Sequence, residues 1–235
     1  METYSISVLG ADKKQYEIAD FRARGTRGMN YANAIGIIVE TEFMSRVLAF
    51  DTWQEQWGNT DRILTEKQNE SVAMQTFSGL DLTKRIVEAQ TDIDGMTAVK
   101  RCWNYQKGGL QWYLPCLMEL GVLCAYRDEI NKAMKEIGCP DECLLPTEDS
   151  DETWVWSSSE YSQGNSWNVY FSSGYFNSSY KYYSGMVRAV AAFQPSPSLL
   201  TGEAKSNDCL HSDEALINML RARGYKGELT KTLII

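Results

Sequence analysis

Alternating apolar and polar stretches along the chain predict a mixture of strands and helices. Residues 34–39 and 46–50 are short apolar runs separated by a turn-like segment, a pattern that predicts a β-hairpin. Apolar residues at helical spacing predict a helix near residues 96–105 and a longer helical stretch over 115–137. The longer stretch either kinks near Gly121 or continues as a second helix.

Further along the chain the spacing of the apolar residues changes from that of a helix to every second residue. Trp167, Val169 and Phe171 alternate with Asn168 and Tyr170, which predicts a strand with one apolar side. We therefore expect the first three side chains in the core and the other two in solvent. Other large apolar residues of this region are also expected in the core: Trp154 and Trp156.

These elements predict an α+β fold with short antiparallel strands and two main helices. We place the principal domain at residues 34–193, after an N-terminal extension over 1–33. Prolines end this domain, and a linker over 194–211 follows. A helix-strand tail is predicted over 212–235, with an apolar stripe that suits docking to a larger assembly or to a second copy of the chain.

Composition singles out one segment, residues 156–185. Its thirty residues include ten Ser, six Tyr, three Asn and three Gly, although the whole chain has only thirteen Tyr. Glu160 and Lys181 are its only charged residues. Tyr offers a large amphipathic contact area at low entropic cost, and Ser, Asn and Gly adapt their hydrogen bonds, as in antibody binding loops. The segment therefore predicts a recognition surface.

Charge and hydropathy exclude several other classes. The net charge is -8, so we expect no nucleic-acid partner, and no apolar run approaches the roughly 18 residues of a membrane span. The chain has one His, and its first residues show no secretory signal, so we expect six reduced cysteines, no metal and no cofactor. Arg188 interrupts an apolar strand and is predicted to be buried beside a carboxylate, with Glu160 as the candidate.

Three segments together carry a resemblance to a known family. They are Trp-Val-Trp-Ser-Ser-Ser-Glu-Tyr at 154–161, Trp-Asn-Val-Tyr-Phe at 167–171 and Val-Arg-Ala-Val-Ala-Ala-Phe at 187–193. The chain resembles the variable proteins of diversity-generating retroelements, which have a C-type lectin-like fold. The resemblance implies that error-prone copying at template adenines rewrites a variable region over 156–193. Lys181 does not arise from the usual template codon, so the resemblance implies that it is fixed.

The resemblance and the composition together predict a ligand-binding surface. The Trp-Asn-Val triplet at 167–169 lacks the calcium ligands of sugar-binding relatives, so we do not carry over calcium-dependent sugar binding. The predicted ligand-binding residues are Tyr161, Asn165, Asn168, Tyr170, Tyr175, Asn177, Ser178, Ser179, Tyr180, Tyr182, Tyr183, Ser184 and Gly185.

The predicted function is binding of a protein or glycan receptor on a cell surface during phage adsorption, without enzymatic activity. The protein is then expected in a phage tail, with virion tail proteins as further partners. An alternative is a bacterial surface adhesin or lectin-like domain. An enzyme resembling formylglycine-generating enzymes is a third interpretation, although Cys139 and Cys143 match its cysteine pair poorly.

Overall fold

The computed structural model describes residues 4–24, 28–58, 62–66, 69–90, 96–148 and 153–194. One compact unit extends from Met1 to Pro195. The predicted tail over 212–235, and all of the predicted linker beyond residue 194, lie outside the described residues.

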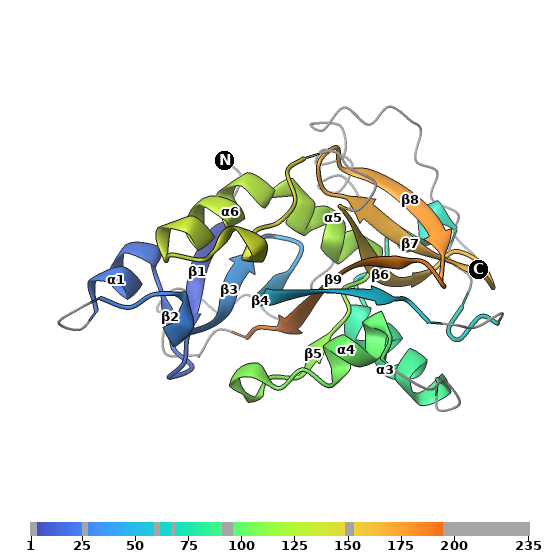
Figure 1. The fold of residues 1–235 in the computed structure, drawn as a ribbon, viewed down its shortest axis with the longest axis horizontal. Coiled ribbons are helices and arrows are strands. Elements are labelled where there is room, and N and C mark those ends of the chain that lie inside the picture. Colours follow the sequence, from blue (N-terminus) through green and yellow to red (C-terminus); the bar gives the residue numbers. More distant parts are fainter. Residues whose placement is uncertain are drawn as a thin grey trace. The chain divides into compact units, whose positions relative to one another are not determined.

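A nine-stranded sheet forms the centre of this unit (Figure 1). Eight strands follow in the order β2-β1-β3-β4-β9-β6-β7-β8, and β5 pairs with β9. Neighbouring strands are antiparallel except β6 and β9, which pair in parallel. The strands are β1 (Ser5–Gly10), β2 (Gln15–Tyr16), β3 (Ala34–Glu40), β4 (Ser45–Gln56), β5 (Trp112–Tyr113), β6 (Trp154–Glu160), β7 (Asn165–Tyr170), β8 (Tyr175–Tyr180) and β9 (Ser184–Ala192).

Helices lie on both sides of the sheet. In Figure 1, α5 and α6 lie above the central strands, and α3, α4 and β5 lie below them. The predicted α+β class is confirmed, with more helices among the described residues than the two expected. These are α1 (Ile18–Ala23), α2 (Glu70–Ala73), α3 (Gly79–Ala89), α4 (Ala98–Trp103), α5 (Leu117–Ala125) and α6 (Arg127–Glu136), with short 3₁₀ turns η1 (Tyr31–Asn33), η2 (Lys107–Gly109) and η3 (Asp141–Cys143).

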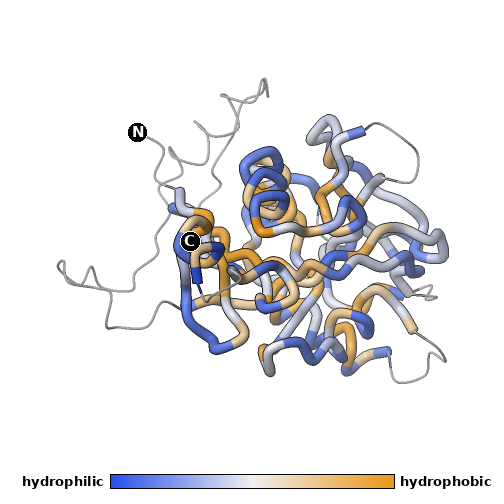
Figure 2. Tube along the Cα trace, turned by 60° about the vertical axis from the view of Figure 1, so that its left-hand side comes forward, coloured by the Kyte–Doolittle hydropathy of each residue, from blue (hydrophilic) through white to orange (hydrophobic). Residues whose placement is uncertain are grey.

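The core lies between the sheet and these helices. The predicted hairpin is confirmed as β3 and β4, and nearly every residue of β3 is buried because both of its faces are covered. Trp57, Trp112 and Trp156 are fully buried. Hydrophobic and hydrophilic segments alternate along helical turns in Figure 2, as expected for helices with one apolar side such as α3 and α6, whereas α5 is apolar on nearly every side and buried.

The helical stretch over 115–137 divides at Tyr126 into α5 and α6. The second-helix alternative is therefore confirmed, and the kink near Gly121 is wrong. Gly121 lies inside α5, where a Cβ atom would come within 2.9 Å of the Phe176 ring. This glycine lets β8 approach the helix closely and does not end it.

Residues of the predicted N-terminal extension join the same sheet. Strand β1 pairs antiparallel with β3, from Ser5 opposite Glu40 to Gly10 opposite Ala34. The boundary expected after residue 33 therefore falls inside the sheet.

Arg188 is fully buried in β9, as predicted, but its predicted carboxylate partner is wrong. Its guanidinium donates to four backbone carbonyls at 2.8–3.0 Å, and Glu160 pairs elsewhere. Burial lowers the pKa of Arg188 to about 10. These carbonyls belong to two segments that approach β9 only in the folded chain: Ala49, Phe50, Cys143 and Leu144.

Candidate functional site

Three tyrosines form an exposed group where β8 ends and β9 begins; we call them the three-tyrosine cluster. Tyr180 ends β8, and Tyr182 and Tyr183 lie in the turn before β9. The rings of Tyr180 and Tyr182 stack with centroids 5.2 Å apart, and the Tyr183 ring meets them edge-on at 5.6 and 4.8 Å. The side chains are 48%, 52% and 49% exposed, so about half of each is available for contact.

Two further predicted residues lie at the same end of the sheet. Asn165 stands opposite Tyr180 in the register of β7 and β8. Tyr161 is exposed, and its ring meets the Trp167 ring edge-on at 5.0 Å. The backbone N–H of Lys181 donates to a carbonyl of the β6–β7 turn at 2.8 Å, which places the two turns side by side.

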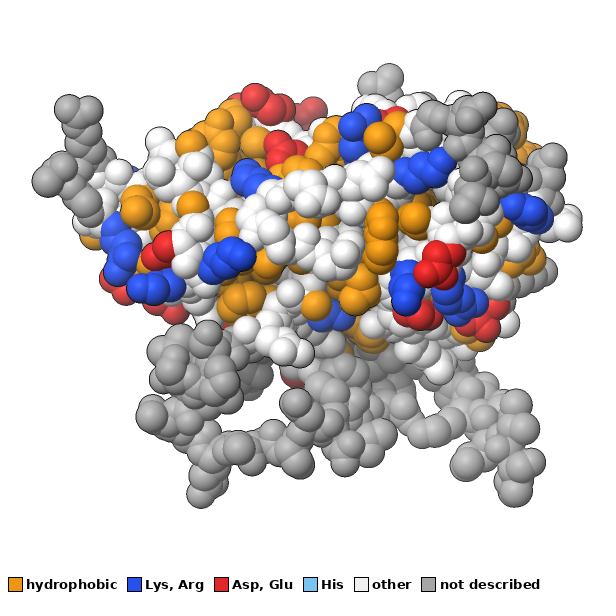
Figure 3. Space-filling model, turned by 90° about the horizontal axis from the view of Figure 1, so that it is seen from below, with side chains coloured by type: hydrophobic (Ala, Val, Ile, Leu, Met, Phe, Trp, Pro, Cys, Tyr) orange, Lys and Arg blue, Asp and Glu red, His pale blue; other side chains and the backbone are white. Residues whose placement is uncertain are grey.

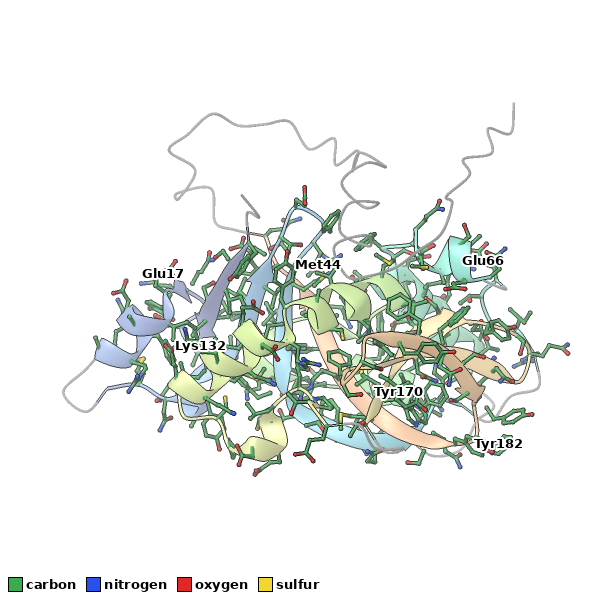
Figure 4. All side chains as sticks on the ribbon, turned by 90° about the horizontal axis from the view of Figure 1, so that it is seen from above. Glu17, Met44, Glu66, Lys132, Tyr170 and Tyr182 are labelled. Carbon is green, nitrogen blue, oxygen red and sulfur yellow. The ribbon has the colours of Figure 1, made fainter. Side chains whose placement is uncertain are left out.

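The remaining tyrosines lie at the other end of β8. Tyr170 and Tyr175 are opposite one another in the register, with ring centroids 6.3 Å apart, and Tyr175 is the most exposed large apolar side chain among the described residues. At 3.3 Å per residue, Tyr175 is about 17 Å from Tyr180 along the strand. Figure 4 likewise shows Tyr170 and Tyr182 well apart. Partly buried residues of β8 join the two ends: Asn177, Ser178 and Ser179.

For two of the predicted surface residues, the expected exposure is wrong. Asn168 is fully buried, and its Nδ2 donates to Ser179 Oγ at 2.9 Å. Strand β7 lies between β6 and β8 and is buried on both faces, whereas the alternation in the sequence implied one open face. Gly185 is buried beneath Trp154, where a Cβ atom would lie 2.2 Å from the indole ring. The exposed part of the predicted surface therefore ends at Ser184.

The three-tyrosine cluster is amphipathic and uncharged at neutral pH. The pKa of the Tyr182 hydroxyl is raised, first by desolvation and then by a hydrogen bond with Tyr183. Lys181, which lies between Tyr180 and Tyr182 in the chain, is 1% exposed, and its ammonium is 2.5 Å from a carboxylate oxygen of Glu160. The cluster thus offers ring faces and hydroxyls to a ligand without a charge that must be desolvated.

Charged side chains on the face shown in Figure 3 are mixed in sign. Lys and Arg side chains lie singly or beside Asp and Glu side chains, and no broad basic area is visible among the described residues of this face. None of the described helices is long and apolar enough to cross a membrane.

The cysteines with the sequence spacing closest to a reactive pair are buried thiols. Burial raises the pKa of Cys139 to about 12 and also raises the pKa of Cys143, so both are protonated at neutral pH. Within the described residues, no group of three His, Cys, Asp or Glu side chains is arranged to hold a metal ion.

Sequence reasoning missed the segments that support the three-tyrosine cluster. Trp57 and Gly58 contact Lys181, and the backbone N–H groups of Leu64 and Thr65 donate to Glu160. Leu64 and Thr65 act chiefly through backbone groups, which leave no side-chain pattern in the sequence.

No family model and no curated protein matches this chain. Among solved structures, the chain is similar to a fimbrial protein from Bacteroides ovatus ATCC 8483, with a TM-score of 0.53 and 14% sequence identity. The match covers 80% of this chain and 48% of the fimbrial protein, so this chain spans about half the length of that protein. At this identity the likeness concerns the fold alone.

Proposed function

We propose that the protein binds a receptor on a cell surface through the three-tyrosine cluster and the residues beside it. The observation that carries the proposal is three mutually packed, half-exposed tyrosines on a buried base. Tyr is enriched at binding hot spots, and a patch of this kind is unusual on a surface without a partner. The receptor is a protein or a glycan.

We further propose that the chain is a variable protein of a diversity-generating retroelement with a C-type lectin-like fold, carried on a phage tail. The three matched segments form β6, β7 and β9, which lie side by side in the sheet, and the Tyr-rich strand β8 pairs with β7 beside them. This is the arrangement expected if fixed residues support exchangeable ones. Flanking DNA with a near-copy of the region coding for 156–193, differing at adenines, beside a reverse transcriptase gene would test it.

A bacterial surface adhesin is the second candidate. The similar solved structure is a fimbrial protein, and this observation is what supports the adhesin candidate. The two candidates share the same binding surface. Virion purification followed by mass spectrometry separates them, because a tail protein copurifies with phage particles and a bacterial adhesin does not.

The binding role can be tested with substitutions in the three-tyrosine cluster. Tyr180→Ala and Tyr182→Ala remove half-exposed rings, so we expect the melting temperature to stay nearly unchanged. Truncation of an aromatic anchor often costs about 2 kcal/mol of binding free energy, or roughly thirtyfold in Kd. Binding of the labelled chain to a panel of bacterial cells, followed by flow cytometry, measures the loss.

Two variants serve as controls. Tyr4→Ala removes a ring of similar exposure, 42%, which packs on Tyr126 away from the cluster, and should leave cell binding unchanged. Trp167→Ala opens a core cavity and should lower stability by roughly 3–5 kcal/mol. Wild-type cell binding by both cluster variants would refute the proposed site.

A further inference from the structure

We propose that Lys181 and Glu160 are positioning residues of the ligand-binding surface, because their buried ion pair holds the three-tyrosine cluster in its binding shape. The role of the cluster in ligand binding rests on the proposed function, but the test of the ion pair requires no receptor. It also gives a physical reason why Lys181 would stay fixed within a run of exchangeable residues.

Lys181 occupies an unusual place for a charged residue. It lies in an exposed turn that a hydrogen bond closes from Tyr183 N to Tyr180 O at 2.9 Å. The residues on both sides of it in the chain are about half exposed, yet Lys181 itself is 1% exposed. Burial of an ammonium group is unfavourable unless the group is paired and hydrogen-bonded, so the conformation of the turn must place this side chain beside its partners.

The partners of the Lys181 ammonium come from three separate segments. Nζ donates to Glu160 Oε1 at 2.5 Å and to the carbonyl of Arg62 at 3.2 Å. It also lies 4.6 Å from the centroid of the Trp57 ring, in cation–π geometry. These contacts fasten the middle of the tyrosine turn to the end of β6 and to the chain after β4.

The backbone of Lys181 is held as firmly as its side chain. Its N–H donates to the carbonyl of Gly164 at 2.8 Å, and its carbonyl accepts from the N–H of Gly58 at 3.2 Å. The tyrosine turn is therefore fixed on one side to the β6–β7 turn and on the other to the end of β4.

Glu160 is the second half of this support. Its carboxylate is fully buried at the end of β6 and accepts from the backbone N–H of Leu64 at 3.0 Å and of Thr65 at 2.7 Å. Thr65 Oγ1 donates a further hydrogen bond at 2.7 Å. With Lys181, these donors satisfy a charge that would otherwise be unfavourable in the interior. The carboxylate thus fastens the segment 62–66 to the tyrosine turn.

This arrangement determines how the tyrosines are presented. The three rings contact one another and are half exposed, so their position depends on the backbone of residues 180–183 more than on core packing. A fixed backbone lowers the conformational entropy lost when a ligand binds. The ion pair therefore acts on binding through the tyrosines, without contacting the ligand.

The test compares the wild-type chain with the double variant Lys181→Met/Glu160→Gln, which leaves no unpaired charge in the interior. The variant should keep its far-UV circular dichroism and a cooperative melt. Its near-UV tyrosine signal should fall toward that of Tyr182→Ala, because the rings no longer stack. Hydrogen exchange at the amides of Gly58 and Lys181 should accelerate at least tenfold.

A second, partly buried ion pair provides the control. Arg46 Nε lies 2.7 Å from Glu119 Oε1, between β4 and α5. Arg46→Met/Glu119→Gln should leave the near-UV tyrosine signal of the cluster and the exchange at Lys181 unchanged. A folded Lys181→Met/Glu160→Gln variant with wild-type signal and wild-type exchange would overturn the proposal.

A milder variant keeps the test decisive if the double variant does not fold. Thr65→Val removes one hydrogen bond to Glu160 and leaves both charges in place. We expect a smaller increase in exchange at Lys181, and no increase would overturn the proposal. Normal cell binding by both Tyr180→Ala and Tyr182→Ala would instead refute the proposed site while leaving the positioning role intact, so the two failures are distinguishable.

Discussion

Arg188 illustrates how a single residue can join parts of the chain that are distant in sequence. Its guanidinium satisfies carbonyls of β4 and of the segment after η3, so it joins strand β9 to both. Carbonyls left unsatisfied in the interior each cost about 1–3 kcal/mol. The residue therefore stabilises the fold through hydrogen bonds more than through an ion pair.

We predict that Arg188→Met lowers the free energy of unfolding by about 3 kcal/mol or more, because the buried carbonyls lose their donors. Urea denaturation measures the change. Arg85→Met is the matched control, since the Arg85 side chain is 39% exposed and its ion pairs within the described residues, with Glu66 and Asp81, lie at the surface. It should change stability by less than about 1 kcal/mol. Equal effects of the two substitutions would contradict the role assigned to Arg188.

The burial of Arg188 could be predicted from the sequence, but its partners could not. A charged residue within an apolar strand indicates a buried site, and a carboxylate is the obvious partner to expect. The actual partners are main-chain carbonyls, which every residue has, so no residue type marks them. Glu160 was wrongly expected to pair with Arg188 because its actual partner, Lys181, lies in a segment whose composition indicates exposure.

At the scale of elements, the spacing of apolar residues predicted where a strand occurs better than it predicted which faces of that strand are covered. The alternation around Trp167 correctly indicated β7, whereas β8, which lies in the segment that composition singled out, was not predicted as a strand. Asn168 was nevertheless expected in solvent, because the local pattern does not record which elements cover a strand. Burial on both faces of β7 depends on neighbours that are contributed by distant parts of the chain.

Gly185 and Ser184 give a test at the start of β9. Gly185→Ala should destabilise the protein by about 1–3 kcal/mol, because the new Cβ atom collides with the Trp154 ring. Ser184→Ala, one residue earlier and exposed, should change stability by less than about 0.5 kcal/mol. Thermal and urea unfolding of the two variants measure the difference. A neutral Gly185→Ala would show that the Trp154 ring can move aside.

For the whole molecule, the buried thiols and phenols predict a dependence of stability on alkaline pH. Burial raises the pKa of Cys102, Cys116 and Tyr113 in the folded protein. In the unfolded chain these thiols ionise near pH 9.0, so above this pH the unfolded state releases protons that the folded state retains. The stabilisation is thus complete below pH 9 and is lost as the pH rises.

We therefore expect the free energy of unfolding to be nearly constant from pH 7 to 8.5 and to fall between pH 9 and 10. Urea unfolding under reducing conditions measures it. Cys102→Ala should show a shallower fall, despite its own packing cost. The lowered pKa of Arg188 acts in the opposite direction but only above about pH 10, outside this range. A stability that rises from pH 8.5 to 10 would contradict the prediction.

Strand β8 lies at one end of the strand order, and among the described strands it pairs only with β7. A change of sequence on this strand therefore disturbs a single ladder, which makes the position tolerant of substitution. The same position favours aggregation, because an edge strand without charges or prolines is a template for pairing with other chains. If β8 is diversified as proposed, the solubility of each new version limits the exchange more than folding does.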